Sequence, residues 1–193
     1  MRNKYSIETI KSFIFGDNWL EPPYYYNNLG KVLRFDLIGK SEQDTYRLIN
    51  NCLSDLFINE SYMYVIFYCT KSISWNKRYF YPFTMRKIFK KKYTSKVDED
   101  KNEENPYVVV GLTKRKYFKD KKYFGEYLRG ERTCAMAFLS CKKKAAVHFY
   151  DSRGFDLFSD NLDFLKGEYS RYKEYIIESD KNEIIKSLSI EDC

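Results

Sequence analysis

Glycine, proline and histidine are scarce in this sequence, which has 8 Gly, 4 Pro and one His among 193 residues. So little Gly and Pro excludes collagen-like, linker-like and prion-like classes of protein. One His and five Cys, an odd number without any CxxC pair, do not supply the closely spaced ligands of a structural zinc site. We therefore expect reduced cysteines, and neither a metal nor a cofactor.

Long hydrophobic runs and the common catalytic motifs are also missing. The longest apolar run near the N-terminus spans residues 13–15, too short for a signal peptide, and the run at 63–69 has the length of a strand. The sequence contains no GxGxxG or GxxxxGK phosphate loop and no GxSxG nucleophile elbow. These observations favour a cytoplasmic protein without a membrane segment, and they single out no residue as catalytic.

Aromatic and charged residues are abundant, at 19% and 32% of the chain, beside 44% hydrophobic residues. This composition is typical of globular proteins rather than disordered ones. A length of 193 residues without a convincing linker predicts a single domain over 1–193. Residues 94–106 contain almost nothing apolar, and we expect them to form an exposed charged loop.

The net charge of +7 is unevenly distributed along the chain. Residues 71–122 carry 16 basic and 6 acidic side chains, whereas residues 149–193 carry 6 basic and 11 acidic ones. One interpretation is that the basic middle docks on an acidic partner, either a phosphate backbone or an acidic protein face. The alternative is a set of solvated lysines that the acidic C-terminal part neutralises.

Two basic clusters provide the candidate partner-binding residues. The denser one lies within 82–93, where Ile88 and Phe89 fit the core-facing positions of a short amphipathic helix. The other is the tip of a predicted β-hairpin, at 141–144. The candidates in these clusters are Arg86, Lys87, Lys90, Lys91, Lys92, Lys142, Lys143 and Lys144.

Apolar periodicity predicts the order of strands and helices. Alternation indicates a strand over 31–39, and Ser41, with an acidic residue three positions later, predicts the N-cap of a helix. A short strand at 155–158 is expected at a sheet edge. The other predicted elements are strands at 61–70, 107–112, 132–140 and 145–151, and helices at 5–15, 120–128, 162–176 and 184–188. Together they predict an α+β fold, with a mainly antiparallel sheet of about five strands and helices packed mostly on one face.

Polar residues on or beside these strands form the candidate site, and they are Arg34, Asp36, His148, Asp151, Arg153 and Asp156. In a functional interpretation they line the open face of the sheet, with His148 as the acid–base group. In a structural interpretation Asp151 caps a turn, Arg153 pairs with Asp156 or Asp36, and His148 is a half-exposed strand residue.

The segment VHFYDSRGFDL at 147–157 and the strand LRFDL at 33–37 resemble a family of bacterial proteins, the domain of unknown function 3885. Ser152 stands where this family has a second Asp, so the resemblance implies no metal site of paired aspartates in this turn. Gly154 is expected to supply a positive φ to the same turn. The family motif carried over to this chain consists of Arg34, Asp36, His148, Tyr150, Asp151, Arg153, Gly154 and Asp156.

The resemblance implies a small bacterial protein with a profile similar to that of immunity proteins. The favoured function is a non-enzymatic protein-binding module, most specifically an immunity protein that neutralises a cognate toxin by occlusion. Its basic residues would dock on that toxin or on another acidic protein. Two alternatives stay open: a nucleic-acid-associated protein using the same basic surface, and an enzyme centred on His148, Arg34 and Asp151.

Overall fold

The computed structural model describes residues 31–69, 89–94, 107–118, 124–125, 127–129 and 135–190, and gives the backbone alone at 69, 89–94 and 107–109. The strands in this part are β1 (Val32–Asp36), β2 (Tyr62–Cys69), β3 (Phe89–Thr94), β4 (Tyr107–Lys114), β5 (Met136–Ser140), β6 (Ala145–Asp151) and β7 (Gly154–Ser159). The α-helices are α2 (Glu42–Leu56), α4 (Leu162–Tyr172) and α5 (Lys181–Leu188), and the 3-10 helices are η5 (Arg115–Tyr117), η6 (Lys173–Tyr175) and η7 (Glu178–Asp180). None of the helices described is both long enough and apolar enough to cross a membrane.

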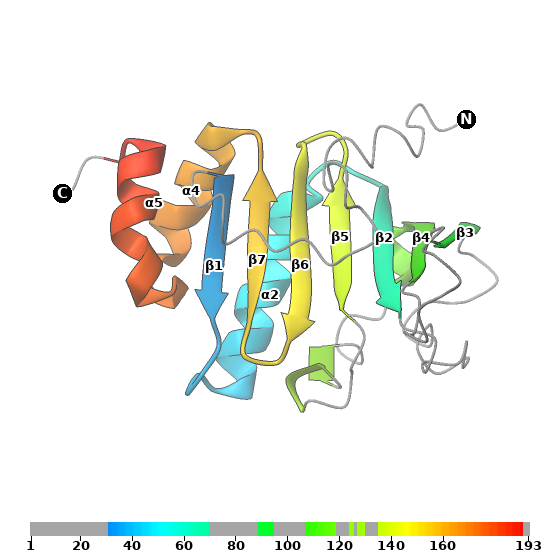
Figure 1. Ribbon diagram of the computed structural model, residues 1–193, viewed down its shortest axis with the longest axis horizontal. Coiled ribbons are helices and arrows are strands. Elements are labelled where there is room, and N and C mark those ends of the chain that lie inside the picture. Colours follow the sequence, from blue (N-terminus) through cyan, green and yellow to red (C-terminus); the bar gives the residue numbers. More distant parts are fainter. Residues whose placement is uncertain are drawn as a thin grey trace, which may run out of the picture.

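All these strands join one sheet in the order β1-β7-β6-β5-β2-β4-β3, and every neighbouring pair is antiparallel (Figure 1). The α+β class and the antiparallel sheet are therefore confirmed, and the described part of the sheet has seven strands rather than about five. β7 pairs with β1 on one side and β6 on the other. The expectation that 155–158 forms a sheet edge is thus wrong, because the strand that covers it comes from a distant part of the chain.

Helix α2 forms where its sequence predicts it. The Ser41 hydroxyl accepts a hydrogen bond from the Asp44 N–H at 3.1 Å, which satisfies one of the free donors of the first turn. Its buried side chains, among them Ile49 and Leu53, recur at helical spacing and belong to the main apolar cluster. Figure 1 shows α2 behind the sheet and α4 and α5 beside β1.

The main apolar cluster joins one face of the sheet to the described helices. From the strands it takes alternate residues such as Phe35, Phe138 and Phe149, and from α4 and α5 it takes Leu165 and Ile184. All five side chains are fully buried or nearly so. Burying a large apolar side chain contributes about 1.5–3 kcal/mol, so this cluster is what holds the helices to the sheet.

The opposite face of the sheet combines a smaller apolar cluster with a polar row. The cluster consists of Val32, Ile66, Tyr68, Val110, Ala137, Leu139, Ala146 and Phe158. Since side chains alternate along a strand, Arg34, Asp156 and His148 fall on this same face. The register places Arg34 opposite Asp156, and Asp156 opposite His148. A row of three polar side chains therefore crosses β1, β7 and β6.

Residues 89–94 form strand β3, so the helix predicted over 82–93 is wrong in its last part. β3 pairs with β4 along its whole length. The helical spacing of its apolar residues is a local signal, and pairing with β4 outweighs it. The rest of that predicted helix, the helix predicted at 5–15 and the predicted loop at 94–106, apart from Thr94, lie outside the described residues.

Candidate functional site

Arg34 stands at the β1 end of the polar row. Its Nη1 donates a hydrogen bond to Asp180 Oδ2 at 3.1 Å, and its Nε lies 3.7 Å from Asp156 Oδ1. Asp180 comes from η7, just before α5, and is buried like Asp156. Two buried carboxylates from different elements therefore fix one partly exposed guanidinium on the face of β1.

Asp156 is the carboxylate that the fold makes costly to ionise. Burial raises its pKa to about 7, although the nearby Arg34 favours the charged form. The Tyr150 hydroxyl lies 3.4 Å from Asp156 Oδ1 and donates to it. Desolvation exceeds the attraction of Arg34 because the guanidinium is too far from Asp156 for a hydrogen bond.

His148 is 1% exposed, so the expectation of a half-exposed strand residue is wrong. Its ring meets those of Tyr68 and Tyr150 at centroid distances of 5.7 and 5.6 Å. Burial lowers the pKa of His148 to about 3, which keeps the imidazole neutral at neutral pH. His148 therefore lies in the polar row as a buried, neutral imidazole in contact with two tyrosine rings.

The turn between β6 and β7 is held by its own side chains. Asp151 Oδ1 accepts a hydrogen bond from the Arg153 N–H at 2.8 Å, and Asp151 Oδ2 accepts one from Arg153 Nη2 at 2.6 Å. Asp151 thus caps the turn as the structural interpretation expected. Arg153 pairs with Asp151 rather than with Asp156 or Asp36, because its partner is two residues away on the same turn.

Gly154 does not adopt the expected positive φ, which Gly39 alone among the described glycines shows. Glycine is needed at this position because there is no room for a side chain. A Cβ at this position would lie 2.4 Å from the Phe35 carbonyl oxygen and 3.3 Å from the Tyr150 hydroxyl. The Gly154 carbonyl also accepts a buried hydrogen bond from the Tyr127 hydroxyl at 2.6 Å. Glycine therefore lets β7 and β1 approach closely at the site.

A pocket of about 310 Å³ opens beside the polar row. Its polar lining residues are Arg34, Asp36, Tyr150 and Arg153, and the others are Phe35, Ile38, Gly154 and Ile177. The fold thus gathers the residues of the family motif from three strands, and five of the eight line this pocket. Asp156 and Asp180, the two carboxylate partners of Arg34, are not among its described lining residues.

The three candidate lysines at the β5–β6 turn differ in solvent exposure. Lys142 and Lys144 are exposed, whereas Lys143 is half-buried. Lys143 Nζ donates to the Asp55 carbonyl and lies 4.4 Å from the centroid of the Phe164 ring. Lys143 therefore anchors the turn to α2 and α4, while its two neighbours project from it.

The lysine positions of β3 alternate between the two faces of the sheet. Successive strand positions belong to opposite faces of a sheet, so the position of Lys91 faces away from those of Lys90 and Lys92. β3 is also separated from β5 by β4 and β2 in the strand order. Arg86 and Lys87 lie outside the described residues.

Sequence periodicity missed an acidic group between α2 and α4. Arg171 Nη1 donates to Asp55 Oδ2 at 2.5 Å and to Glu168 Oε1 at 3.2 Å, and Asp55 also accepts from the Tyr172 hydroxyl. Burial and the charge of Asp55 raise the pKa of Glu168 to about 7. The one available signal was the position of Glu168 beside Tyr169, which belongs to the apolar stripe of α4.

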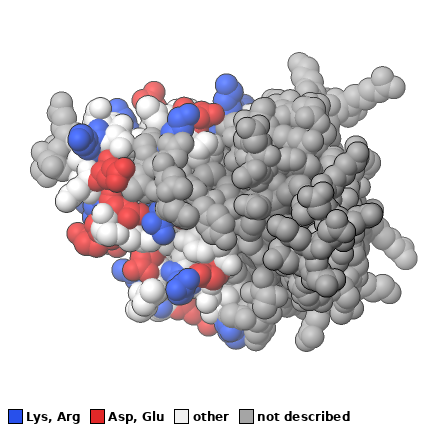
Figure 2. All heavy atoms as spheres, in the orientation of Figure 1, with Lys and Arg blue, Asp and Glu red and all other residues white. Residues whose placement is uncertain are grey.

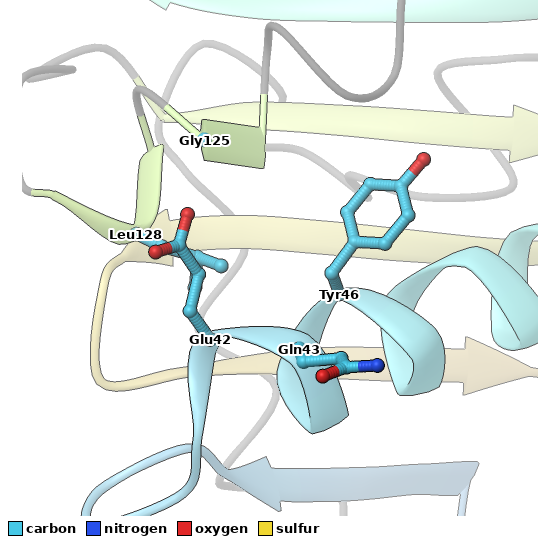
Figure 3. Close-up of a pocket in the computed structure, with 5 residues that line it drawn as sticks. All are labelled: Glu42, Gln43, Tyr46, Gly125 and Leu128. Atoms are coloured by element: carbon cyan, nitrogen blue, oxygen red, sulfur yellow. The ribbon is translucent and has the colours of Figure 1, made fainter.

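A larger pocket, of about 450 Å³, lies between the first turns of α2 and the segment 124–128. Figure 3 shows Glu42, Gln43 and Tyr46 on α2, with Gly125 and Leu128 on the other segment. None of these residues was singled out from the sequence. Glu42 is the one charged residue in the described lining, so this pocket offers no acid–base pair.

A comparison with known proteins shows to which family the chain and its motif belong. The model of a family described as a domain of unknown function (DUF3885) matches residues 11–180, which include every residue of the motif. No curated protein and no solved structure matches the chain. Because the match spans most of the sequence, the chain belongs to the DUF3885 family of domains of unknown function.

Proposed function

We propose that this protein is a non-enzymatic protein-binding module, and most specifically a cytoplasmic bacterial immunity protein that neutralises a cognate toxin by occluding it. The observation that carries the proposal is the β5–β6 turn, which holds two exposed lysines on a firmly anchored backbone. A preorganised charged loop loses little conformational entropy when it binds, so it suits recognition.

Exposed apolar side chains flank the two lysines. Ile58 is 54% exposed, and its N–H donates to the same Asp55 carbonyl that Lys143 binds. Leu162 is 41% exposed and begins α4, just after Asp160, whose N–H donates to the Lys144 carbonyl. We call Ile58, Lys142, Lys144 and Leu162 the tip surface. Apolar anchors with charged neighbours are typical of protein interfaces.

The charge of the tip surface points to an acidic protein. Within the residues described, neither Lys142 nor Lys144 forms an ion pair, whereas Lys31 is paired with Asp160 at 2.6 Å. Figure 2 shows basic and acidic side chains interspersed over the described part of the face in view. Lys142 acts electrostatically on Glu60, but neither exposed lysine is held in an ion pair with a described residue. Both can therefore add attraction for an acidic surface and speed the encounter with it.

We expect the double change Lys142→Glu and Lys144→Glu to abolish most partner binding. Reversing two interface charges weakens binding by roughly 100-fold at low salt, and by less at high salt, because ions screen the repulsion. The measurement is a pull-down with the tagged protein from host lysate, treated with nuclease, followed by titration of the purified partner at two salt concentrations.

The matched control is Lys173→Glu with Lys186→Glu, which makes the same charge change at two exposed lysines near α4 and α5. We expect it to bind as the wild type does. A partner bound equally well by the tip variant would contradict the proposed surface. Loss of all bound material on nuclease treatment would instead favour the nucleic-acid alternative, whose affinity falls steeply with salt whatever the sequence.

A further inference from the structure

The pocket beside the polar row combines charges of both signs with apolar walls. Arg34 and Arg153 bring two guanidinium groups to it, and Asp36 brings a carboxylate. Asp36 uses Oδ1 to accept a hydrogen bond from the Ile38 N–H at 2.9 Å. Within the described residues its second oxygen, Oδ2, has no hydrogen-bond partner, so it can accept from a ligand.

Arg34 is presented to the pocket in a fixed orientation. Asp180 binds one nitrogen of its guanidinium, and the Nε is buried without a hydrogen bond. A guanidinium has five N–H donors, and these contacts occupy few of them. The Tyr150 hydroxyl and the 75% exposed Arg153 stand beside it in the same lining. This arrangement suits a carboxylate, which arginine binds in a bidentate manner.

The balance of charges around the pocket selects against simple ions. A polyanion would be repelled by Asp36 and by the nearby carboxylates of Asp151, Asp156 and Asp180. A simple cation would meet the guanidinium groups of Arg34 and Arg153 first. A ligand that carries one charge of each sign can match both and costs least to bind. The exposed Ile38 and the half-buried Ile177 offer apolar contact to the rest of such a ligand.

We propose that this pocket binds a free α-amino acid with an apolar side chain, with its carboxylate on Arg34 and Arg153 and its ammonium on Asp36. Ile38 and Ile177 pack against the side chain. The site lies at the β1–β7–β6 end of the sheet and uses no residue of the tip surface, so it is independent of the proposed partner binding.

The test is titration calorimetry of the full-length protein with leucine, leucinamide and N-acetylleucine. We expect saturable binding of leucine, and affinity at least 10-fold lower for the amide, which lacks the carboxylate, and for the acetylated form, which lacks the ammonium. Absence of saturable leucine binding would overturn the proposal. Binding of either analogue as tightly as leucine would also overturn the proposal, because it would show that the missing charged group is not recognised.

The informative variant is Arg153→Gln, because Arg153 is exposed and its pairing with Asp151 contributes little to stability. We expect leucine affinity to fall at least 5-fold while the thermal unfolding midpoint stays unchanged. The matched control is Arg47→Gln on α2, an exposed arginine that pairs with Asp44 and does not line the pocket. Wild-type affinity in Arg153→Gln would overturn the assignment of the carboxylate position.

Discussion

Replacing Gly154 with alanine should destabilise the protein by about 3 kcal/mol, at the upper end of the range for overpacking a tight site. The added Cβ would lie 2.4 Å from the Phe35 carbonyl oxygen, which is backbone and cannot rotate away. Relief requires β7 to move from β1, and this strains the hydrogen bond from Tyr127 to the Gly154 carbonyl. Urea unfolding followed by circular dichroism measures the change.

Gly167 provides the matched control. It lies exposed within α4, and a Cβ there would meet no atom within 4 Å. Gly167→Ala should therefore stabilise the protein by about 0.5–1 kcal/mol, since alanine favours a helix over glycine. If both substitutions change the free energy of unfolding in the same direction and by similar amounts, the close approach of β1 and β7 is not what requires Gly154.

Replacing Asp156 with asparagine should remove a large pH dependence of stability. The pKa of Asp156 is about 7 in the folded protein and 3.8 in its ordinary state, so between these values the folded chain holds a proton that the unfolded chain has lost. The free energy of unfolding therefore falls as pH rises from about 4 to about 7, and the loss is complete above pH 7. Asparagine resembles the neutral acid. At pH 8 the free energy of unfolding of the variant should therefore exceed that of the wild type by on the order of 3 kcal/mol.

The comparison isolates Asp156 because both proteins retain the other buried titratable groups. Glu168, whose pKa is raised, acts in the same direction as Asp156. His148, whose pKa is lowered, acts in the opposite direction and adds stability as pH rises from about 3 to 6.5. Both contributions cancel in the difference between the two proteins. If the difference in unfolding free energy between the two proteins is the same at pH 5 and pH 8, the pKa of Asp156 is not raised by burial as described.

Local sequence patterns predicted much of the site. Alternation along β1 placed Arg34 and Asp36 on one face, and Ser41 marked the start of α2. The β5–β6 hairpin with its basic tip and the turn capped by Asp151 were also predicted correctly. Each of these features depends on residues close together in the sequence, where backbone geometry and short-range hydrogen bonds decide the outcome.

The features that sequence missed depend on distant contacts. Asp180 reaches Arg34 across 146 residues, and no local pattern links them. His148 is buried by rings from two strands, one of them distant in sequence. β3 became a strand because β4 lies beside it. In each case tertiary packing, rather than the neighbouring residues, fixes the environment of the side chain.

In the proposed function, the tip surface occludes a toxic acidic protein. The most direct test is the survival of cells that express the captured partner together with this protein, counted as colonies. We predict that the wild type and the Lys173→Glu, Lys186→Glu control restore growth, and that the Lys142→Glu, Lys144→Glu variant, expressed at the same level, does not. Full protection by the tip variant, or no protection by the wild type, would contradict the account.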